Sequence, residues 1–311
     1  MSMDGHRQNS IPTTFAAMSK TRLAHLLLLI VGIIYGVNYS VGKGVTPEYL
    51  PPLGLVVIRA TVACGLFWVY HALFIRERVQ HRRDYWLFLR AGLFGVAFNQ
   101  MLFFKGLSLT SPINAAVIMT VNPILVLGLS ALLIKERITW RKVAGMALGL
   151  TGALLLIGSG DLSLSSDTFV GDLLILANAT SYALYLVLVK PLMARYQPET
   201  VVKWIFLMGL PVIWIIGGAE FFEIGWSTVP TRAWWAMAYI IIGTTFLAYG
   251  LNAKALRYVS SSLVGYYIYL QPLIATLVAV SIGQDTLTLD TVFQASLIFG
   301  GVFLVSWKPK G

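Results

Sequence analysis

Ten apolar stretches, each about as long as a membrane-crossing helix, constrain what this chain can fold into. A helix needs about 20 apolar residues to cross the hydrocarbon layer of a bilayer. Stretches near this length cover residues 24–43, 53–75, 86–106, 112–134, 142–158, 171–190, 202–219, 233–253, 260–282 and 291–307. Pro, Gly or charged clusters separate nearly all of them. The pattern predicts an all-α membrane protein with ten transmembrane helices.

The composition indicates that lipid is the solvent of these stretches. Hydrophobic residues make up 57% of the chain and charged residues 12%, against roughly 45–50% and about 25% in soluble domains. One compact domain could not bury so much apolar surface, so membrane lipid is the expected partner of the outer faces. The first 22 residues are polar, and an apolar run of spanning length follows. We expect a cytoplasmic tail over residues 1–22 and a retained first span, not a cleaved signal peptide.

Basic residues are distributed unevenly between the loops. If the N-terminus is cytoplasmic, only Lys43, Lys105 and Arg232 lie on the opposite side, and Arg59 and Arg90 lie within spans. Cytoplasmic loops of membrane proteins carry an excess of Lys and Arg. The distribution predicts a multi-pass protein of the plasma (cytoplasmic) membrane with both termini in the cytoplasm. It also accounts for the net charge of +10 without a nucleic-acid partner.

The first half of the chain recurs in the second half. A shift of 149 positions superposes pairs of identical residues, among them Lys105 on Lys254, Ser111 on Ser260 and Pro123 on Pro272. A shift of 147 positions does the same nearer each unit's start, superposing Tyr35 on Tyr182 and Lys43 on Lys190. Spans and loops coincide under the same shifts. This pattern predicts two units, residues 23–158 and 171–307.

The number of spans in each unit sets the orientation of the second unit. Each unit contains five spans, and an odd number reverses the direction in which the second unit enters the membrane. Inverted repeats can exchange conformations and so expose a central site first to one side and then to the other. We therefore predict two inverted five-helix repeats around a central cavity.

Short motifs at matched positions of the two units are typical of a known family. The first unit contains Gly106-Leu107, Thr110-Ser111, Ala115-Ala116, Pro123, Glu136-Arg137-Ile138-Thr139, Gly145, Gly149 and Gly152. The second contains Ala255-Leu256, Ser260-Ser261, Pro272, Gly283-Gln284-Asp285-Thr286-Leu287-Thr288 and Gly301. Over residues 24–307 the sequence resembles the EamA family of the drug/metabolite transporter superfamily. It departs from the family's Gly-Glu-Arg-hydrophobic-Thr segment at Lys135, where Gly is usual, and at Asp285, where Glu is common.

The resemblance carries expectations about architecture and activity. It implies ten helices in two antiparallel five-helix bundles, with a central cavity lined largely by spans one, three, four, six, eight and nine. It implies transport of a small organic metabolite or drug-like solute and favours export. It identifies no single substrate, because members of the family carry many.

Polar side chains within the spans mark the expected cavity, because such side chains are costly in lipid unless they face protein or water. Asn122 and Gln271 each precede a proline at matched positions, and a proline frees backbone carbonyls in mid-span. The residues expected to contact substrate are Tyr35, Asn38, Asn99, Gln100, Asn114, Asn122, Tyr182, Tyr185, Tyr249, Asn252, Tyr267 and Gln271. Asn178 and Thr245 are further polar residues within these spans. The alternative is that these side chains only bond between helices, at about 0.6 kcal/mol each.

Four cations could bind an anionic group of a substrate, namely Arg59, Arg90, Lys105 and Lys254. Lys105 and Lys254 lie near span ends, where long side chains reach lipid headgroups, and Arg90 lies near a basic loop. Arg59 lies deeper, and a structural ion or carbonyl partner is its alternative role. Every Asp and Glu falls in a loop or at a span end, so no carboxylate is placed in mid-membrane as a proton relay. We expect a facilitator, an exchanger or coupling through another group.

These patterns favour a transporter of a small-molecule substrate over two other classes of membrane protein. An integral-membrane enzyme acting on a lipid or isoprenoid substrate usually needs clustered carboxylates or histidines, but the four histidines are scattered and the one cysteine is Cys64. A structural or channel-like protein is the other alternative. We expect no enzymatic activity, cofactor or metal. The oligomeric state stays open, and a monomer is compatible with the sequence.

Overall fold

The computed structural model describes residues 19–157, 168–281 and 289–307, and all regular structure within these ranges is helical. In the first half the helices are α1 (Lys20–Lys43), α2 (Pro52–Phe74), α3 (Asp84–Gly92), η1 (Leu93–Phe98), α4 (Asn99–Leu109), α5 (Pro112–Met119), α6 (Asn122–Ile134) and α7 (Trp140–Ile157). In the second half they are α8 (Phe169–Leu188), α9 (Lys190–Arg195), α10 (Pro198–Phe222), η2 (Trp226–Thr228), α11 (Thr231–Ala238), η3 (Tyr239–Leu247), α12 (Ala248–Tyr258), α13 (Ser261–Tyr266), η4 (Tyr267–Tyr269), α14 (Leu270–Ser281) and α15 (Leu289–Ser306).

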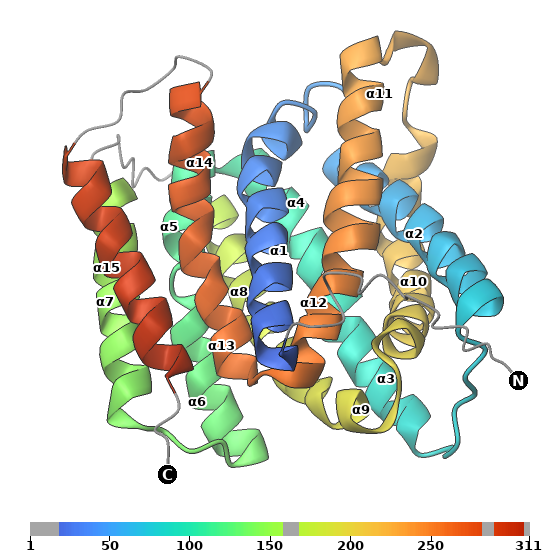
Figure 1. The fold of residues 1–311 in the computed structure, drawn as a ribbon. Helices are drawn as coiled ribbons and strands as arrows, with labels where there is room; N and C mark the ends of the chain where they lie inside the picture. Colours follow the sequence, from blue (N-terminus) through green and yellow to red (C-terminus); the bar gives the residue numbers. More distant parts are fainter. Residues whose placement is uncertain (1–18, 158–167, 282–288, 308–311) are drawn as a thin grey trace, which may run out of the picture.

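Within the described residues these helices join into ten long runs, which confirms the all-α prediction (Figure 1). Four runs are α1, α2, α7 and α10, and the last is α15. The others are the composite runs α3–η1–α4, α5–α6, α8–α9, α11–η3–α12 and α13–η4–α14. Six of the ten are 23 to 28 residues long and apolar enough to cross a membrane. The protein is therefore a multi-pass membrane protein.

The two halves run in opposite directions. In Figure 1, α1 begins at the lower end of the bundle and α8 begins at the upper end. The runs that follow alternate in direction, so α15 ends at the same face where α1 begins. The predicted inversion of the second five-helix repeat is thus confirmed.

Two matched lysines display the symmetry in atomic detail. Lys43, the last residue of α1, donates from Nζ to the carbonyls of Leu107 at 2.9 Å and Thr110 at 2.8 Å. These carbonyls belong to the last turn of α4 and to the residue that follows it, where a helix leaves acceptors unpaired. Lys190 bonds in the same way to the carbonyls of Leu256 and Val259 at the end of α12. The two lysines lie at opposite ends of the bundle.

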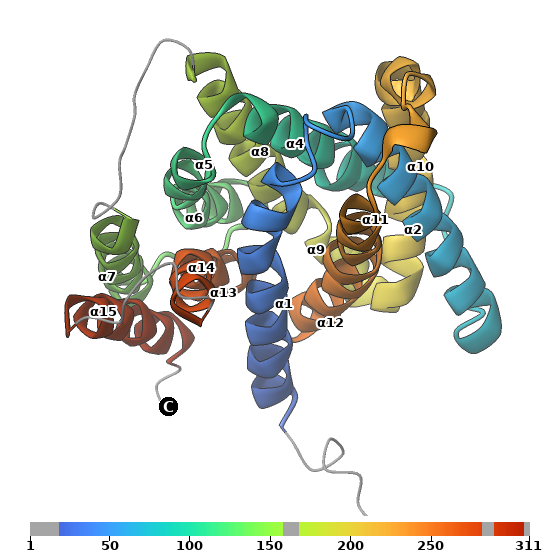
Figure 2. The same cartoon turned by 90° about the horizontal axis from the view of Figure 1, so that it is seen from above.

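The first run of each half packs into the other half. α1 packs against α12 and α14, and α8 packs against α4 and α6. Each of these contacts is the image of the other under the repeat, and Figure 2 shows both groups from above. α7 lies beside α15 at one edge, and α2 lies beside α10 at the other. The halves are therefore interlocked, and the centre of the molecule lies between the α1–α12–α14 group and the α4–α6–α8 group.

Glycines let α7 and α15 approach closely. A Cβ atom added at Gly145 would lie 2.8 Å from the carbonyl oxygen of Gly301, and one added at Gly152 would lie 2.8 Å from that of Gln294. Gly145 and Gln294 are matched positions of the repeat, as are Gly152 and Gly301. The two contacts are thus images of each other across the interface of the fifth and tenth runs.

Large apolar side chains also cover the outside of the bundle. Ile215 on α10 is 82% exposed and Leu132 on α6 is 76% exposed. Water would disfavour such a surface, whereas lipid tails solvate it. The buried apolar side chains fill the contacts between helices, and buried polar side chains lie both at the centre and elsewhere, as where His71 of α2 bonds to Thr200 of α10.

Candidate functional site

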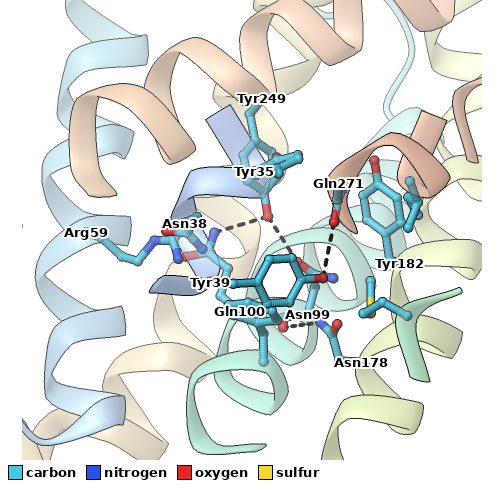
Figure 3. Close-up of a pocket in the computed structure, with 13 residues that line it drawn as sticks. Tyr35, Asn38, Tyr39, Arg59, Asn99, Gln100, Asn178, Tyr182, Tyr249 and Gln271 are labelled. Carbon is cyan, nitrogen blue, oxygen red and sulfur yellow. Dashed lines mark hydrogen bonds between the residues drawn. The ribbon is translucent and has the colours of Figure 1, made fainter. Parts of the chain in front are cut away.

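A cavity of about 570 Å³, including its open side, lies where the two halves meet, and Figure 3 shows its lining. Its walls come from seven of the ten runs, α2 among them, and consist of Tyr35, Asn38, Tyr39, Arg59, Asn99, Gln100, Phe103, Met119, Asn178, Tyr182, Tyr249, Ile268 and Gln271. The cavity is lined by both repeats, as the family resemblance implies.

Two π-helical segments position the polar side chains of the third and eighth runs. η1 covers Leu93–Phe98, and the matched part of η3 covers residues 242–247. The lining residues Asn99, Gln100 and Tyr249 follow directly after these segments. A π-helical turn holds one residue more than an α-helical turn, so it rotates the side chains beyond it. Such bulges occur often at functional sites.

Gln100 and Tyr249 meet at the pseudo-twofold axis. They occupy the same position in the two repeats, 149 residues apart, and Gln100 Nε2 lies 3.4 Å from Tyr249 Oη. The Tyr249 hydroxyl donates to the carbonyl of Gly95 at 2.8 Å, with Asn99 Oδ1 at 3.3 Å. This cluster binds the third run to the eighth in the floor of the cavity.

The fourth and ninth runs are interrupted at matched places. α5 ends at Met119 and α6 begins at Asn122, while the 3₁₀ turn η4 interrupts the ninth run at Tyr267–Tyr269. The interruptions lie immediately before Pro123 and Pro272, as expected for residues that break the helical hydrogen-bond ladder. Gln271 lines the cavity and accepts a hydrogen bond from Tyr39 Oη at 3.1 Å.

Several buried amide oxygens in this region have no hydrogen-bond partner in the described structure. They are Oδ1 of Asn38, Oε1 of Gln100 and Oδ1 of Asn178. Asn178 Nδ2 donates to the carbonyl of Asn99 at 2.6 Å, which fixes the amide so that its oxygen is an acceptor. Unpaired buried acceptors cost free energy unless water or a ligand donates to them. These three oxygens belong to residues of the cavity wall and are unpaired in the described structure.

Arg59 brings a positive charge into the cavity wall. It lies on α2, is 4% exposed, and donates from Nε to Thr245 Oγ1 at 2.9 Å. Its guanidinium also lies over the Phe104 ring, with Cζ 4.8 Å from the ring centroid. Both of these neighbours of the Arg59 guanidinium, the Thr245 hydroxyl and the Phe104 ring, are uncharged.

The structure brings together more than half of the residues that the sequence singles out. Those in the cavity wall are Tyr35, Asn38, Asn99, Gln100, Tyr182, Tyr249 and Gln271. The side chain of Asn114 lies outside the described residues. Asn252 stands behind the wall and donates to Tyr182 Oη at 2.6 Å. For all of these residues, contact with a substrate stays a prediction.

Three other residues on that list lie away from the cavity. Asn122 Nδ2 donates to the carbonyl of Ala179 on α8 at 2.6 Å. Tyr267 Oη lies 2.6 Å from His25 Nδ1 at the start of α1. Tyr185 is buried against the backbone of Gly95, where an added Cβ would lie 2.2 Å from its ring. These side chains contact neighbouring helices and do not line the cavity, and their contact with a substrate stays a prediction.

The cavity wall also includes residues outside the expected substrate contacts. Tyr39 and Phe103 lie one helical turn beyond Tyr35 and Asn99, so the four-residue spacing of a helix face could have identified them. Met119 and Ile268 are apolar, and no sequence signal separates them from lipid-facing residues. Of the four cations considered, Arg59 alone lies in this wall; Lys105 forms an ion pair with Glu220 at 3.5 Å.

The described residues hold no group of three or more His, Cys, Asp or Glu side chains placed to bind a metal ion. The chemistry of the cavity is that of hydrogen bonds, aromatic faces and one guanidinium. Such a lining can select and orient a small molecule.

Known proteins resemble the chain over nearly its whole length. "Uncharacterized transporter YyaM" of Bacillus subtilis (strain 168) is 24% identical over 91% of this chain and 93% of that protein. An "uncharacterized transporter" of Archaeoglobus fulgidus is 27% identical over 91% and 97% of the two chains. A "probable terminal-alkyne amino-acid exporter" of Streptantibioticus cattleyicolor is 25% identical over 87% and 86%.

A solved crystal structure shares the fold, with a TM-score of 0.73 and 21% identity over 92% of this chain and 98% of that one. The model of the EamA-like transporter family matches residues 22–158 and again residues 169–307. Each match falls on one of the two inverted five-helix halves. This chain therefore belongs to the EamA-like transporter family.

Proposed function

We propose that this protein carries a small organic metabolite out of the cell by alternating access of its central cavity. The observation that carries the proposal is the position of the cavity, which both repeats line and in which Gln100 meets its repeat partner Tyr249. A binding site on the axis of an inverted repeat can face either side when the halves exchange conformations. The substrate contacts would be the predicted residues in the cavity wall.

The proposed orientation places both termini in the cytoplasm of a cell with this protein in its plasma membrane. The excess of Lys and Arg in the loops on that side supports it. The outward direction is supported by the relative named as a probable amino-acid exporter. A C-terminal reporter enzyme that is active only in the cytoplasm tests the orientation, and an inactive reporter on a correctly inserted chain would contradict it.

Transport is tested with purified protein in lipid vesicles. Vesicles are loaded with a panel of metabolites, and release is followed with and without a proton gradient. We expect saturable release of at least one solute and counter-exchange of that solute across the membrane. Release that rises linearly with concentration, without exchange, would favour a channel.

Two matched isoleucine variants assign the flux to the cavity. Ile268 lies in the cavity wall, whereas Ile215 faces lipid and is 82% exposed. Ile268→Trp fills the cavity and is expected to abolish release, while Ile215→Trp makes the same chemical change on the outside and leaves release unchanged. Size-exclusion profiles show whether both variants are folded. Full release by folded Ile268→Trp would contradict the assignment.

A further inference from the structure

The Arg59 guanidinium reaches the cavity from α2 without a charged partner. Nε donates to Thr245 Oγ1 at 2.9 Å, and Nη2 lies 3.5 Å from Thr244 Oγ1. Both threonine hydroxyls are neutral, and each donates its own proton to the carbonyl of Ile240 at 2.7 Å. A guanidinium carries five N–H donors, so most of them are not used by these contacts. In Figure 3 the Arg59 side chain extends among the labelled lining residues.

No carboxylate in the described part of the chain neutralises this charge. The ion pairs found there lie elsewhere: Lys105 with Glu220, Lys142 with Glu136, Arg195 with Asp84 and Arg232 with Glu48. Arg59 is nonetheless 4% exposed and lies within a run of spanning length. A buried charge in a membrane protein is unfavourable unless a counter-charge or water meets it. Arg59 lines the central cavity, so a solute bound there would lie beside its guanidinium.

We propose that Arg59 is the anion-binding group of this cavity, and that the transported solute carries a carboxylate or another anionic group at one end. The inference rests on the proposed transport function and adds a substrate class to it. Arginine binds carboxylate and phosphate with paired N–H donors in a fixed geometry. The aromatic and apolar wall residues Tyr39, Phe103 and Ile268 then contact the uncharged body of the solute.

A purely structural role for Arg59 makes a different prediction. In that case its purpose is the bond to Thr245, which joins α2 to η3. Removing the hydroxyl with Thr245→Val would then destabilise the protein as much as removing the charge. If Arg59 binds the solute, Thr245→Val keeps the preference for anions, because the charge stays in the cavity.

The test compares solutes that differ only in charge. The probes are butanoate and butanamide, 3-phenylpropanoate and 3-phenylpropanamide, phenylalanine and phenylalanine amide, with phenylphosphonate and inorganic phosphate as phosphorus-containing anions. Purified full-length protein is assayed in two ways, by thermal stabilisation in detergent and by competition with release of the panel metabolites from vesicles. We expect an acid to act at a concentration about tenfold lower than its amide, since one charged hydrogen-bonded contact has this effect on affinity.

The variants separate the charge from the fold. Arg59→Gln is expected to bring acid and amide within about twofold of each other, and Arg59→Lys is expected to restore part of the preference. Arg90→Gln is the matched control, because Arg90 is an exposed arginine on α3, and it leaves the preference unchanged. Melting curves confirm that each variant is folded.

The outcomes distinguish this inference from the function on which it rests. If vesicles release metabolites but amides act as well as acids, the cavity does not select anions and transport still stands. If Arg59→Gln keeps the acid preference, Arg59 is not the anion-binding group and transport again still stands. If neither the carboxylates nor the phosphorus-containing anions act on the protein in either assay, the inference is also overturned. If no panel solute is released at all, the proposed transport function fails. Activity of phenylphosphonate without the carboxylates would assign the site to phosphorus-containing anions.

Discussion

Asn122 and Gln271 hold the same position in the two repeats, yet their side chains have different neighbours. Gln271 faces the cavity and bonds to the Tyr39 hydroxyl at 3.1 Å. Asn122 is fully buried and donates to the Ala179 carbonyl on α8 at 2.6 Å. The same amide group thus lines the cavity in one half and bonds to a neighbouring helix in the other.

Replacing each amide by alanine separates these roles. Gln271→Ala is expected to lower the rate of solute release at least tenfold while the melting temperature changes little. Asn122→Ala removes the added hydrogen bond to the Ala179 carbonyl, which should lower the free energy of unfolding by about 1 kcal/mol with release per folded molecule retained. Vesicle release and thermal melts measure the two effects. Unchanged release by Gln271→Ala would contradict the assignment of this side chain to the substrate path.

Sequence spacing predicted part of the cavity wall because helical periodicity holds on regular helices. Tyr35 and Asn38 lie on the uninterrupted helix α1, and both line the cavity. Tyr267 is four residues before Gln271, a spacing that puts both on one α-helical face. The turn η4 has 3₁₀ geometry with about three residues per turn, so the relation is lost and Tyr267 points to His25. A local change of helix type could not be read from the residue types.

At the scale of a single element, the end of α6 shows how a sequence departure is accommodated. Lys135 is the residue after α6 and has φ 55° and ψ 35°, the left-handed conformation. Glycine is favoured there because it has no Cβ atom, and glycine is what the related family sequences usually have. The lysine side chain is exposed. The chain therefore holds a strained residue at a helix end without a compensating contact by that side chain.

Lys135→Gly is expected to raise the free energy of unfolding by about 1 kcal/mol, because it removes the steric cost of a Cβ atom in this conformation. Lys135→Ala is the control, since it removes the same charge but keeps the Cβ atom, and it should give no comparable gain. Thermal unfolding in detergent measures both. Equal stabilisation by the two variants would assign the effect to charge instead of backbone conformation.

The π-helical segments η1 and η3 are element features that sequence reasoning did not predict. Their residues are ordinary apolar ones, and the hydrogen-bond shift from i−4 to i−5 depends on packing with neighbouring helices. The composite runs that contain them were still predicted as spans, because length and apolar content do not depend on the helix type. The sequence therefore predicted that these spans exist, but it could not predict how the π-helical segments rotate the side chains that follow them.

At the scale of the whole molecule, the interface of α7 and α15 depends on the absence of side chains. An added Cβ at Gly301 would lie 1.8 Å from Tyr266 Oη and 2.4 Å from the carbonyl oxygen of Gly145. At the neighbouring Gly300 nothing lies within 4 Å of such an atom. These two adjacent glycines face different surroundings on the same helix.

Gly301→Ala is expected to lower the free energy of unfolding by about 1–3 kcal/mol through overpacking. Gly300→Ala should be neutral or stabilising by up to about 1 kcal/mol, because alanine favours a helix. Melting temperatures of the two purified variants measure the difference. Similar losses in both would mean that backbone flexibility, and not the contact with α7, determines the effect.

The architecture was predictable to the level of span count and inversion because both follow from counting apolar stretches and matching residues. How the halves interlock was not, since nothing in the repeat indicates that α1 packs against α12 and α14. Matched pairs such as Lys43 and Lys190 indicated the duplication from the sequence, but their bonds to the ends of α4 and α12 became visible only in the structure.

Each of those two lysines joins the first run of its own half to the end of the third run of that half, and so links the α1–α12–α14 group to the α4–α6–α8 group. Lys43 extends from α1, which packs with α12 and α14, to the end of α4, and Lys190 extends from the α8–α9 run to the end of α12. Each therefore acts as a latch at one mouth of the molecule. Under the proposed alternating access, we expect opening at either end to break the contact there and keep the other, so that the relative strength of the two contacts sets the resting bias between outward and inward states.

Weakening one latch should then shift that bias toward its own side. Lys43→Met is expected to raise, and Lys190→Met to lower, the labelling of a cysteine placed at the outer mouth by a membrane-impermeant thiol reagent. Lys254→Met, at an exposed lysine on α12, is the control and should leave labelling unchanged. A shift of both latch variants in the same direction would mean that the lysines only stabilise helix ends. If the shifts are opposite, the relative strength of the two lysine contacts determines to which side of the membrane the cavity of the substrate-free protein is open.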